Sequence, residues 1–181
     1  MLNSPVWRGP ARYAFCGGLL LGALGTAFVL LVAGSLVRLA APPVVWRCAL
    51  AGAVALLTLR ELGVLRFWLP QNPRLVPEYV HRHGPVFGPL QFGFEIGTSV
   101  RTYTPSALPH ATALMILLLA DPLAALAAGA GFGLGRALMT VGNLSFSGDN
   151  SWDDAWIAGE RWIRRILVVA FAVATTAVLL R

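Results

Sequence analysis

Long apolar runs are the feature that most constrains this chain. The run from Tyr13 to Val37 contains no charged residue, and similar runs recur along the rest of the sequence. A stretch of about 20 apolar residues can cross the hydrocarbon core of a bilayer. Only 12% of the residues are charged, against about 25% in an average soluble domain, so little polar surface is left to face water. The sequence therefore predicts an integral membrane protein.

The runs predict an all-α, polytopic transmembrane helix bundle that forms a single membrane domain over residues 1–181. About five membrane helices are expected, at residues 13–37, 44–65, 89–120, 122–141 and 161–180. Residues 66–88 are rich in proline and arginine. Prolines at this density prevent a long regular helix, so we expect a cytoplasmic loop there.

The segment 89–120 is longer than a bilayer requires, and Pro105 and Pro109 interrupt it. Proline removes a backbone hydrogen bond and clashes with the preceding turn, which predicts a kinked or broken helix. A complete split would raise the number of spans to six. Irregular backbone is tolerated at membrane depth only where protein or a wet cavity surrounds it. At the end of this segment, Asp121 and Pro122 are suited to cap and open the next helix.

Polar side chains follow a helical spacing along the same segment. They are Gln91, Glu95, Thr98, Ser99, Thr102 and Ser106. At this spacing they would share one face of a continuous helix. An ionisable group on that face must point to protein or water, because lipid would penalise it. The substrate or groove candidates are therefore Glu95, Thr98, Ser99, Thr102, Pro105, Ser106 and Pro109; the alternative is that the stripe only fixes helix packing.

A structural ion pair is expected between Glu95 and Arg136. The two residues should lie at similar depth on antiparallel neighbouring helices, given the rise of about 1.5 Å per residue. The alternative is that Arg136 reaches independently to the lipid headgroups. Close helix packing is also expected at Gly18 and Gly22, and along one face that contains Gly129, Gly131, Gly133 and Gly135.

All the basic residues apart from histidine are arginines, and the net charge is +6. The arginines lie mainly near the ends of apolar runs, which favours the lipid bilayer over nucleic acid as their partner. A cytoplasmic N-terminus would place Arg8, Arg12, Arg66, Arg74, Arg82, Arg161, Arg164 and Arg165 inside, and Arg38, Arg47 and Arg181 outside. The excess of arginines on the inner side agrees with the positive-inside rule, so a cytoplasmic N-terminus is predicted. Arginine in place of lysine, with abundant alanine and glycine, favours a bacterial cell membrane.

Ordinary catalytic motifs are absent from the sequence, so no catalytic residue and no cofactor are predicted. His81 and His83 by themselves make a poor metal site, so no metal site is expected. Cys16 and Cys48 are far apart in the sequence. They form neither a redox motif nor a disulfide framework, and we expect no bond between them.

One segment resembles a known family. Thr104-Pro105-Ser106-Ala107-Leu108-Pro109 is similar to the Ser-Pro-Cys-x-Leu-Pro segment of the CcdA/DsbD-like transmembrane thiol–disulfide transporters, which include cytochrome c biogenesis proteins. The glycine-rich segment 131–135 and the apolar run 163–180 follow in a similar order. The resemblance covers roughly residues 89–181 and implies a transporter-type fold. Ser106 stands where the family motif has cysteine, so it does not imply thiol redox activity, which requires a thiolate.

Two functions remain open from the sequence. The first is a transporter or redox-relay protein of this kind, with a water-accessible groove beside Ser106 and a membrane or thioredoxin-like partner protein. The second is a non-catalytic membrane subunit that binds another membrane protein.

Overall fold

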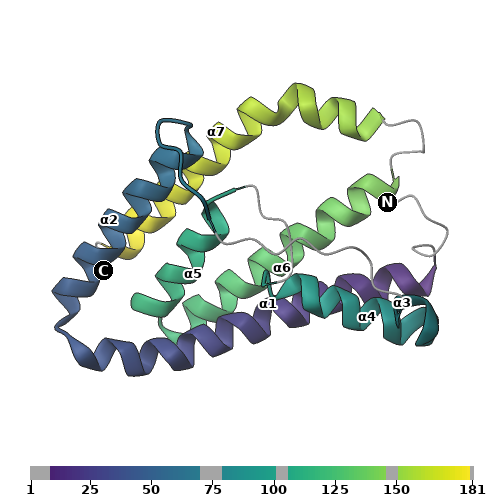
Figure 1. Ribbon diagram of the computed structural model, residues 1–181, viewed down its shortest axis with the longest axis horizontal. Coiled ribbons are helices and arrows are strands. Elements are labelled where there is room, and N and C mark those ends of the chain that lie inside the picture. Colours follow the sequence, from purple (N-terminus) through teal and green to yellow (C-terminus); the bar gives the residue numbers. More distant parts are fainter. Residues whose placement is uncertain (1–8, 70–78, 101–105, 146–150, 180–181) are drawn as a thin grey trace. The chain divides into compact units, whose positions relative to one another are not determined.

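The computed structural model of the chain describes residues 9–69, 79–100, 106–145 and 151–179. Every regular element in these ranges is helical, which confirms the predicted all-α class. The elements are α1 (Pro10–Val37), the short 3-10 helix η2 (Arg38–Ala40), α2 (Pro43–Glu61), α3 (Tyr79–Arg82), α4 (Gly84–Gly97), α5 (Leu108–Leu118), α6 (Pro122–Ser145) and α7 (Ser151–Leu179). Figure 1 shows their order along the chain.

Four helical segments are long and apolar enough to cross a membrane. They are Pro10–Ala40, Pro43–Glu61, Pro122–Gly142 and Asp154–Leu179, with mean hydropathy values from 1.4 to 2.3. The protein is therefore a multi-pass integral membrane protein. The remaining predicted span, 89–120, is divided between α4 and the short apolar helix α5.

The break in this span confirms that the segment is not one continuous helix, but its position differs from the prediction. Helix α4 ends at Gly97, well before Pro105, and Ser99 has a left-handed backbone with φ of 60°. Pro109 lies in the first turn of α5, where its missing N–H is tolerated. The predicted single polar face from Gln91 to Ser106 therefore does not form.

The other helix boundaries lie closer to the predicted ones. Helix α2 ends at Glu61 rather than at residue 65, and α3 with the start of α4 occupies part of the predicted loop 66–88. Pro85 and Pro89 are both accommodated in α4. Pro85 lies in the first turn, where a proline is compatible with a helix.

The helices are grouped into two compact units, which are described separately. The first unit comprises Met1–Thr26, Gln71–Tyr103 and Leu126–Ala155. The second comprises Ala27–Pro70, Thr104–Ala125 and Trp156–Arg181.

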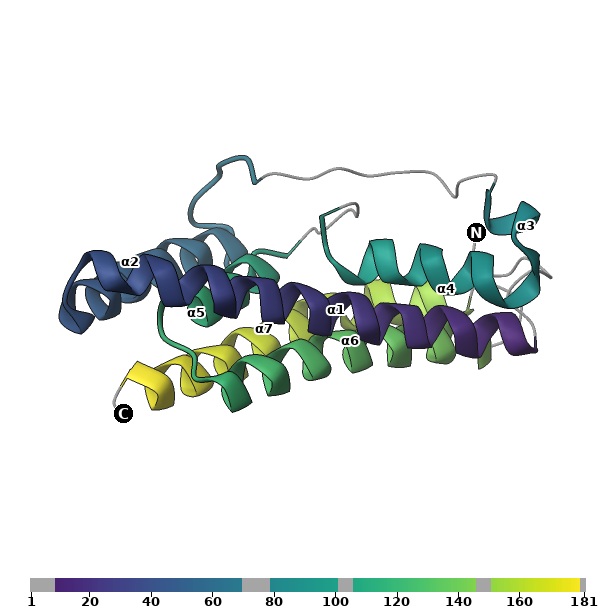
Figure 2. The same ribbon diagram turned by 90° about the horizontal axis from the view of Figure 1, so that it is seen from below.

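In the first unit, α4 lies directly against the first part of α1, as Figure 2 shows. A Cβ atom at Gly18 or Gly22 would overlap the carbonyl oxygens of Leu90 or Phe94 in α4. Gly93 and Gly97 of α4 would likewise overlap backbone atoms of α1. The two backbones are therefore in contact through small residues on both helices. This confirms the close packing predicted for Gly18 and Gly22.

Only part of the glycine-rich face predicted in α6 is packed. A Cβ atom at Gly133 would press against the backbone of Leu20 in α1, and Gly129 is buried. Gly131 and Gly135, in contrast, have open space where a Cβ atom would lie. Gly129 and Gly133 thus lie on one face of α6, and Gly131 and Gly135 lie on another. Positions two residues apart point in different directions on a helix.

In the second unit, α2 packs against α5. Leu50, Val54 and Leu57 of α2 form a buried core with Ala111 and Leu118, and Phe171 of α7 packs on its edge. The predicted cap of α6 is confirmed, because the Asp121 carboxylate accepts the Ala124 N–H at 2.9 Å. These contacts fix the ends of α2 and α5 and so position the site described next.

Candidate functional site

The last residue of α2, Glu61, carries a carboxylate that is only 8% exposed. Its Oε2 atom accepts the backbone N–H of Ala107, just before α5, at 2.7 Å. A buried carboxylate is costly unless hydrogen bonds or charges compensate it. The backbone at the start of α5 supplies one such bond, and the short apolar helix is held to α2 by it.

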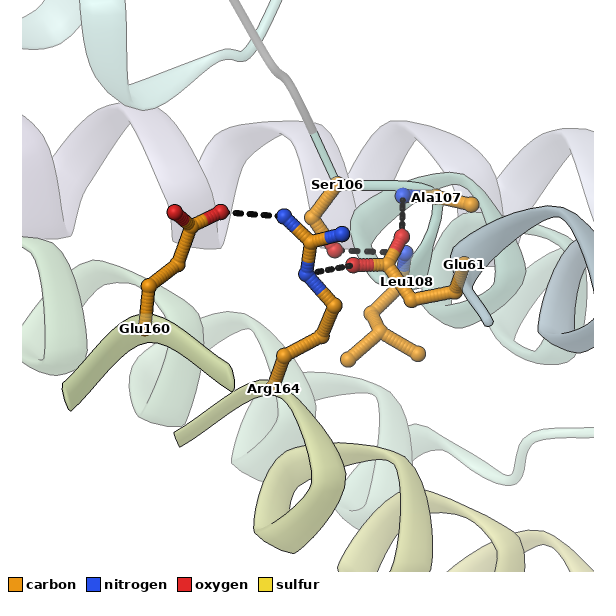
Figure 3. Close-up of polar contacts among 6 residues, drawn as sticks. All are labelled: Glu61, Ser106, Ala107, Leu108, Glu160 and Arg164. Carbon is orange, nitrogen blue, oxygen red and sulfur yellow. Dashed lines mark hydrogen bonds and ion pairs between the residues drawn. The ribbon is translucent and has the colours of Figure 1, made fainter. Parts of the chain in front are cut away.

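A guanidinium from α7 approaches the same carboxylate. The Nε atom of Arg164 lies 3.9 Å from Oε1 of Glu61, and its Nη2 atom forms an ion pair with Glu160 one turn earlier. Figure 3 shows Arg164 between the two carboxylates. About half of the Arg164 side chain is exposed, so the surroundings screen these pairs and each contributes no more than about 1 kcal/mol.

A groove of about 150 Å³ opens beside these charges, entirely within the second unit. We call it the Glu61 groove; it is lined by Glu61, Ser106, Leu108, Trp156, Glu160, Ile163, Arg164 and Leu167. The Ser106 Oγ atom accepts the Leu108 N–H at 3.1 Å, which leaves its hydroxyl hydrogen available to a ligand. The lining thus combines an apolar wall with polar groups at one end, as small-molecule sites commonly do.

The charges of the Glu61 groove determine what it can bind. Two carboxylates and one guanidinium line it, so it carries an excess of negative charge. Among the described residues, the Nε atom of Arg164 approaches Glu61 Oε1 to 3.9 Å, which is too long for a hydrogen bond. This oxygen can therefore accept a hydrogen bond from a small solute. A cavity of about 150 Å³ is large enough for a molecule the size of benzene.

The structure places the residues predicted from sequence in two different units. Glu95 lies in the last turn of α4, and Thr98 follows it, with its hydroxyl bonded to the Glu95 carbonyl at 2.7 Å. The Ser99 hydroxyl is buried without a partner among the described residues. Ser106 lines the Glu61 groove. Pro109 opens α5, while Thr102 and Pro105 lie outside the described residues.

Arg136 packs near the end of α4. Its Nη1 atom donates to the Ile96 carbonyl at 3.5 Å, and its guanidinium lies 5.6 Å from the centre of the Phe132 ring. Ile96 is next to Glu95 in the sequence. The Glu95–Arg136 ion pair stays a prediction.

Sequence reasoning missed Glu61, Glu160 and Arg164 as site residues. Arg164 was counted only among the arginines whose distribution predicts the orientation in the membrane. A signal was the carboxylate itself, since Glu61 is the last residue of the span Pro43–Glu61 and ionisable residues within membrane spans are often functional. Nothing in the sequence, however, brings residues 61, 106 and 164 together.

Among the described residues, no group of three or more histidine, cysteine, aspartate or glutamate side chains could hold a metal ion. Cys16 and Cys48 are both free thiols. Compared with known protein families, curated proteins and solved structures, the chain gives no match. The resemblance to the CcdA/DsbD-like transporters therefore rests only on the sequence motif around Ser106 and on the order of the two segments that follow it.

Proposed function

We propose that this chain is a transporter-type membrane protein, resembling the CcdA/DsbD-like fold, that admits a small polar solute to the Glu61 groove. The observation that carries the proposal is the buried Glu61 carboxylate beside the broken segment, with one oxygen facing the groove. Transporters commonly bind solutes where a membrane helix is interrupted, because the freed backbone and nearby polar groups supply hydrogen bonds.

The proposed solute is not a thiol or disulfide. Ser106 occupies the position of the motif cysteine, and a hydroxyl cannot take part in thiol–disulfide exchange. The excess of carboxylates in the Glu61 groove favours a solute that donates hydrogen bonds or carries positive charge. The apolar wall formed by Leu108, Ile163 and Leu167 favours one with a short hydrocarbon part.

The test is whether an aqueous reagent reaches Ser106 in the membrane. We would introduce Ser106→Cys into a chain in which Cys16 and Cys48 are replaced by alanine, and treat membrane vesicles with a hydrophilic maleimide. The proposal predicts labelling of Ser106→Cys. A matched control is Ala111→Cys in α5, because Ala111 is only 1% exposed and should stay unlabelled. If the two variants are equally unreactive, no solute path reaches the groove and the proposal fails.

We further propose that the N-terminus faces the cytoplasm and that the protein resides in the inner membrane of a bacterium. The arginine distribution supports this orientation, since basic residues concentrate in cytoplasmic segments. A thioredoxin-like partner would be expected only if thiol chemistry were present, so it is not part of the proposal.

The second candidate function is a non-catalytic membrane subunit. It is favoured by Gly131 and Gly135 of α6, where an added Cβ atom would meet no described atom within 4 Å. Small residues at this spacing let a partner helix approach closely in a bilayer. This alternative predicts that Gly131→Leu reduces the size of the complex in mild detergent, measured by light scattering. It also predicts that Ser106→Cys resists labelling.

A further inference from the structure

The eight residues that follow α2 form a loop of defined shape. Gly63 has a φ of +79°, a left-handed conformation that ends the helix, and its N–H bonds to the Arg60 carbonyl at 3.0 Å. Arg60 Nε donates to the Phe67 carbonyl at 2.9 Å, so the loop turns back on the helix end. Leu69 is buried in the core formed with α2 and α5. The loop is thus fixed at both ends.

This loop borders a wide-open hollow of about 470 Å³, which we call the Arg60–Arg66 hollow. Its lining residues are Arg60, Gly63, Leu65, Arg66, Phe67 and Trp68. Among these described residues, two are arginines and none is acidic. The neighbouring Glu61 carboxylate lines the separate Glu61 groove, where its Oε2 atom accepts the Ala107 N–H.

The guanidinium of Arg60 is oriented in advance for a ligand. Its Nε atom is held by the Phe67 carbonyl, and its carbon lies 5.5 Å from the centre of the Phe67 ring. Within the described residues, neither Arg60 nor Arg66 pairs with a carboxylate. Planar guanidinium groups bind phosphate oxygens well, and two of them can share one phosphate. The C-terminal end of the α2 dipole is near and disfavours an anion, but it is equivalent to only about half a negative charge.

The hollow also lies where a membrane span ends. The apolar segment Pro43–Glu61 stops directly before it. Trp68 is 77% exposed and Phe67 is 41% exposed, as is usual for aromatic residues at the level of the headgroups. We propose that the Arg60–Arg66 hollow binds the phosphate group of an anionic phospholipid, with Phe67 and Trp68 beside the lipid's glycerol and upper acyl region.

Native mass spectrometry of the full chain in detergent tests this site. Phosphatidylglycerol and phosphatidylcholine would be added separately, and the bound lipid counted on the intact protein. Each arginine near a membrane surface contributes about 1 kcal/mol to binding of anionic lipid, or roughly five-fold in affinity. Arg66→Gln should therefore lower phosphatidylglycerol binding by about five-fold. The double variant with Arg60→Gln should lower it further, and phosphatidylcholine binding should not depend on either residue.

Three comparisons make the result decisive. Arg47→Gln removes the same charge from the opposite end of α2, where Arg47 is exposed, and should leave phosphatidylglycerol binding unchanged. Equal losses in Arg47→Gln and Arg66→Gln would overturn the site, because they would indicate general charge attraction. Inorganic phosphate that displaces the lipid at equal concentration would assign the hollow to a free anion and overturn the lipid proposal. Arg66→Gln should unfold at the wild-type temperature, since Arg66 bonds to no described residue; an early unfolding transition would mean that Arg66 has a structural role instead.

Discussion

At Glu61, a single carboxylate contacts two parts of the chain, and the two contacts can be separated by substitution. Glu61→Gln removes the charge but keeps an oxygen that can accept the Ala107 N–H. Because Arg164 is half exposed, losing its ion pair should cost less than about 1 kcal/mol of unfolding free energy. Glu61→Leu instead leaves the Ala107 N–H without its partner, which costs about 1–3 kcal/mol.

Thermal unfolding in detergent would measure this difference, with Glu61→Leu expected to melt clearly below Glu61→Gln. Asp154→Asn is a suitable control, since Asp154 is an exposed carboxylate that does not line the Glu61 groove. Equal losses in the two Glu61 variants would mean that the stabilising contribution of Glu61 comes from its pairing with Arg164 in α7, and not from the hydrogen bond to Ala107.

Single residues were predictable from sequence where their partners are close along the chain. The cap formed by Asp121 depends on Ala124, three residues later, so residue types alone indicate it. The bond from Ala107 to Glu61 joins positions 46 residues apart. It depends on how α2 packs against α5, which no local pattern specifies. For this reason Ser106 was predicted as a groove residue, while Glu61 and Arg164 were not.

Among the elements, the crossing of α1 and α4 depends most directly on residue size. Gly22→Ala would place a methyl group on the Phe94 carbonyl oxygen, which is backbone and cannot move aside. Overpacking of this kind costs about 1–3 kcal/mol. Gly131→Ala in α6 is the matched control, because it meets nothing within 4 Å. We expect Gly22→Ala to lower the folded yield in detergent and Gly131→Ala to leave it unchanged or slightly raised. Similar yields for both variants would contradict the close crossing.

The break between α4 and α5 was predictable in kind but not in position. Prolines at 105 and 109 indicated an interruption, and one occurs. The end of α4 at Gly97 has a different origin, because Gly97 packs against the Leu19 backbone and Ser99 then adopts a positive φ. Proline patterns report the local backbone. The contact of Gly97 is with another helix, α1, so the sequence around it does not indicate where α4 ends. The polar residues that were expected to share one helical face are instead divided between the two units.

For the whole molecule, the side of the membrane on which the C-terminus lies depends on what α4 and α5 do together. At 1.5 Å per residue, α4 with 14 residues and α5 with 11 residues measure about 21 Å and 17 Å, so neither alone spans a core of about 30 Å. In series they could cross once; as a re-entrant pair they would return to the side they left.

The arginines distinguish these two arrangements. With a cytoplasmic N-terminus and one broken crossing, Arg161, Arg164 and Arg165 lie inside and Arg181 lies outside. A re-entrant pair would place each of these four arginines on the opposite side of the membrane. Most of the excess of arginines on the cytoplasmic side would then be lost, which disagrees with the positive-inside rule. We therefore predict a single broken crossing with the C-terminus outside. Alkaline phosphatase fused after Arg181 should be active, and the same enzyme fused after Arg82 should be inactive. An inactive fusion at both positions would instead establish the re-entrant arrangement, and an active fusion after Arg82 would reverse the proposed orientation.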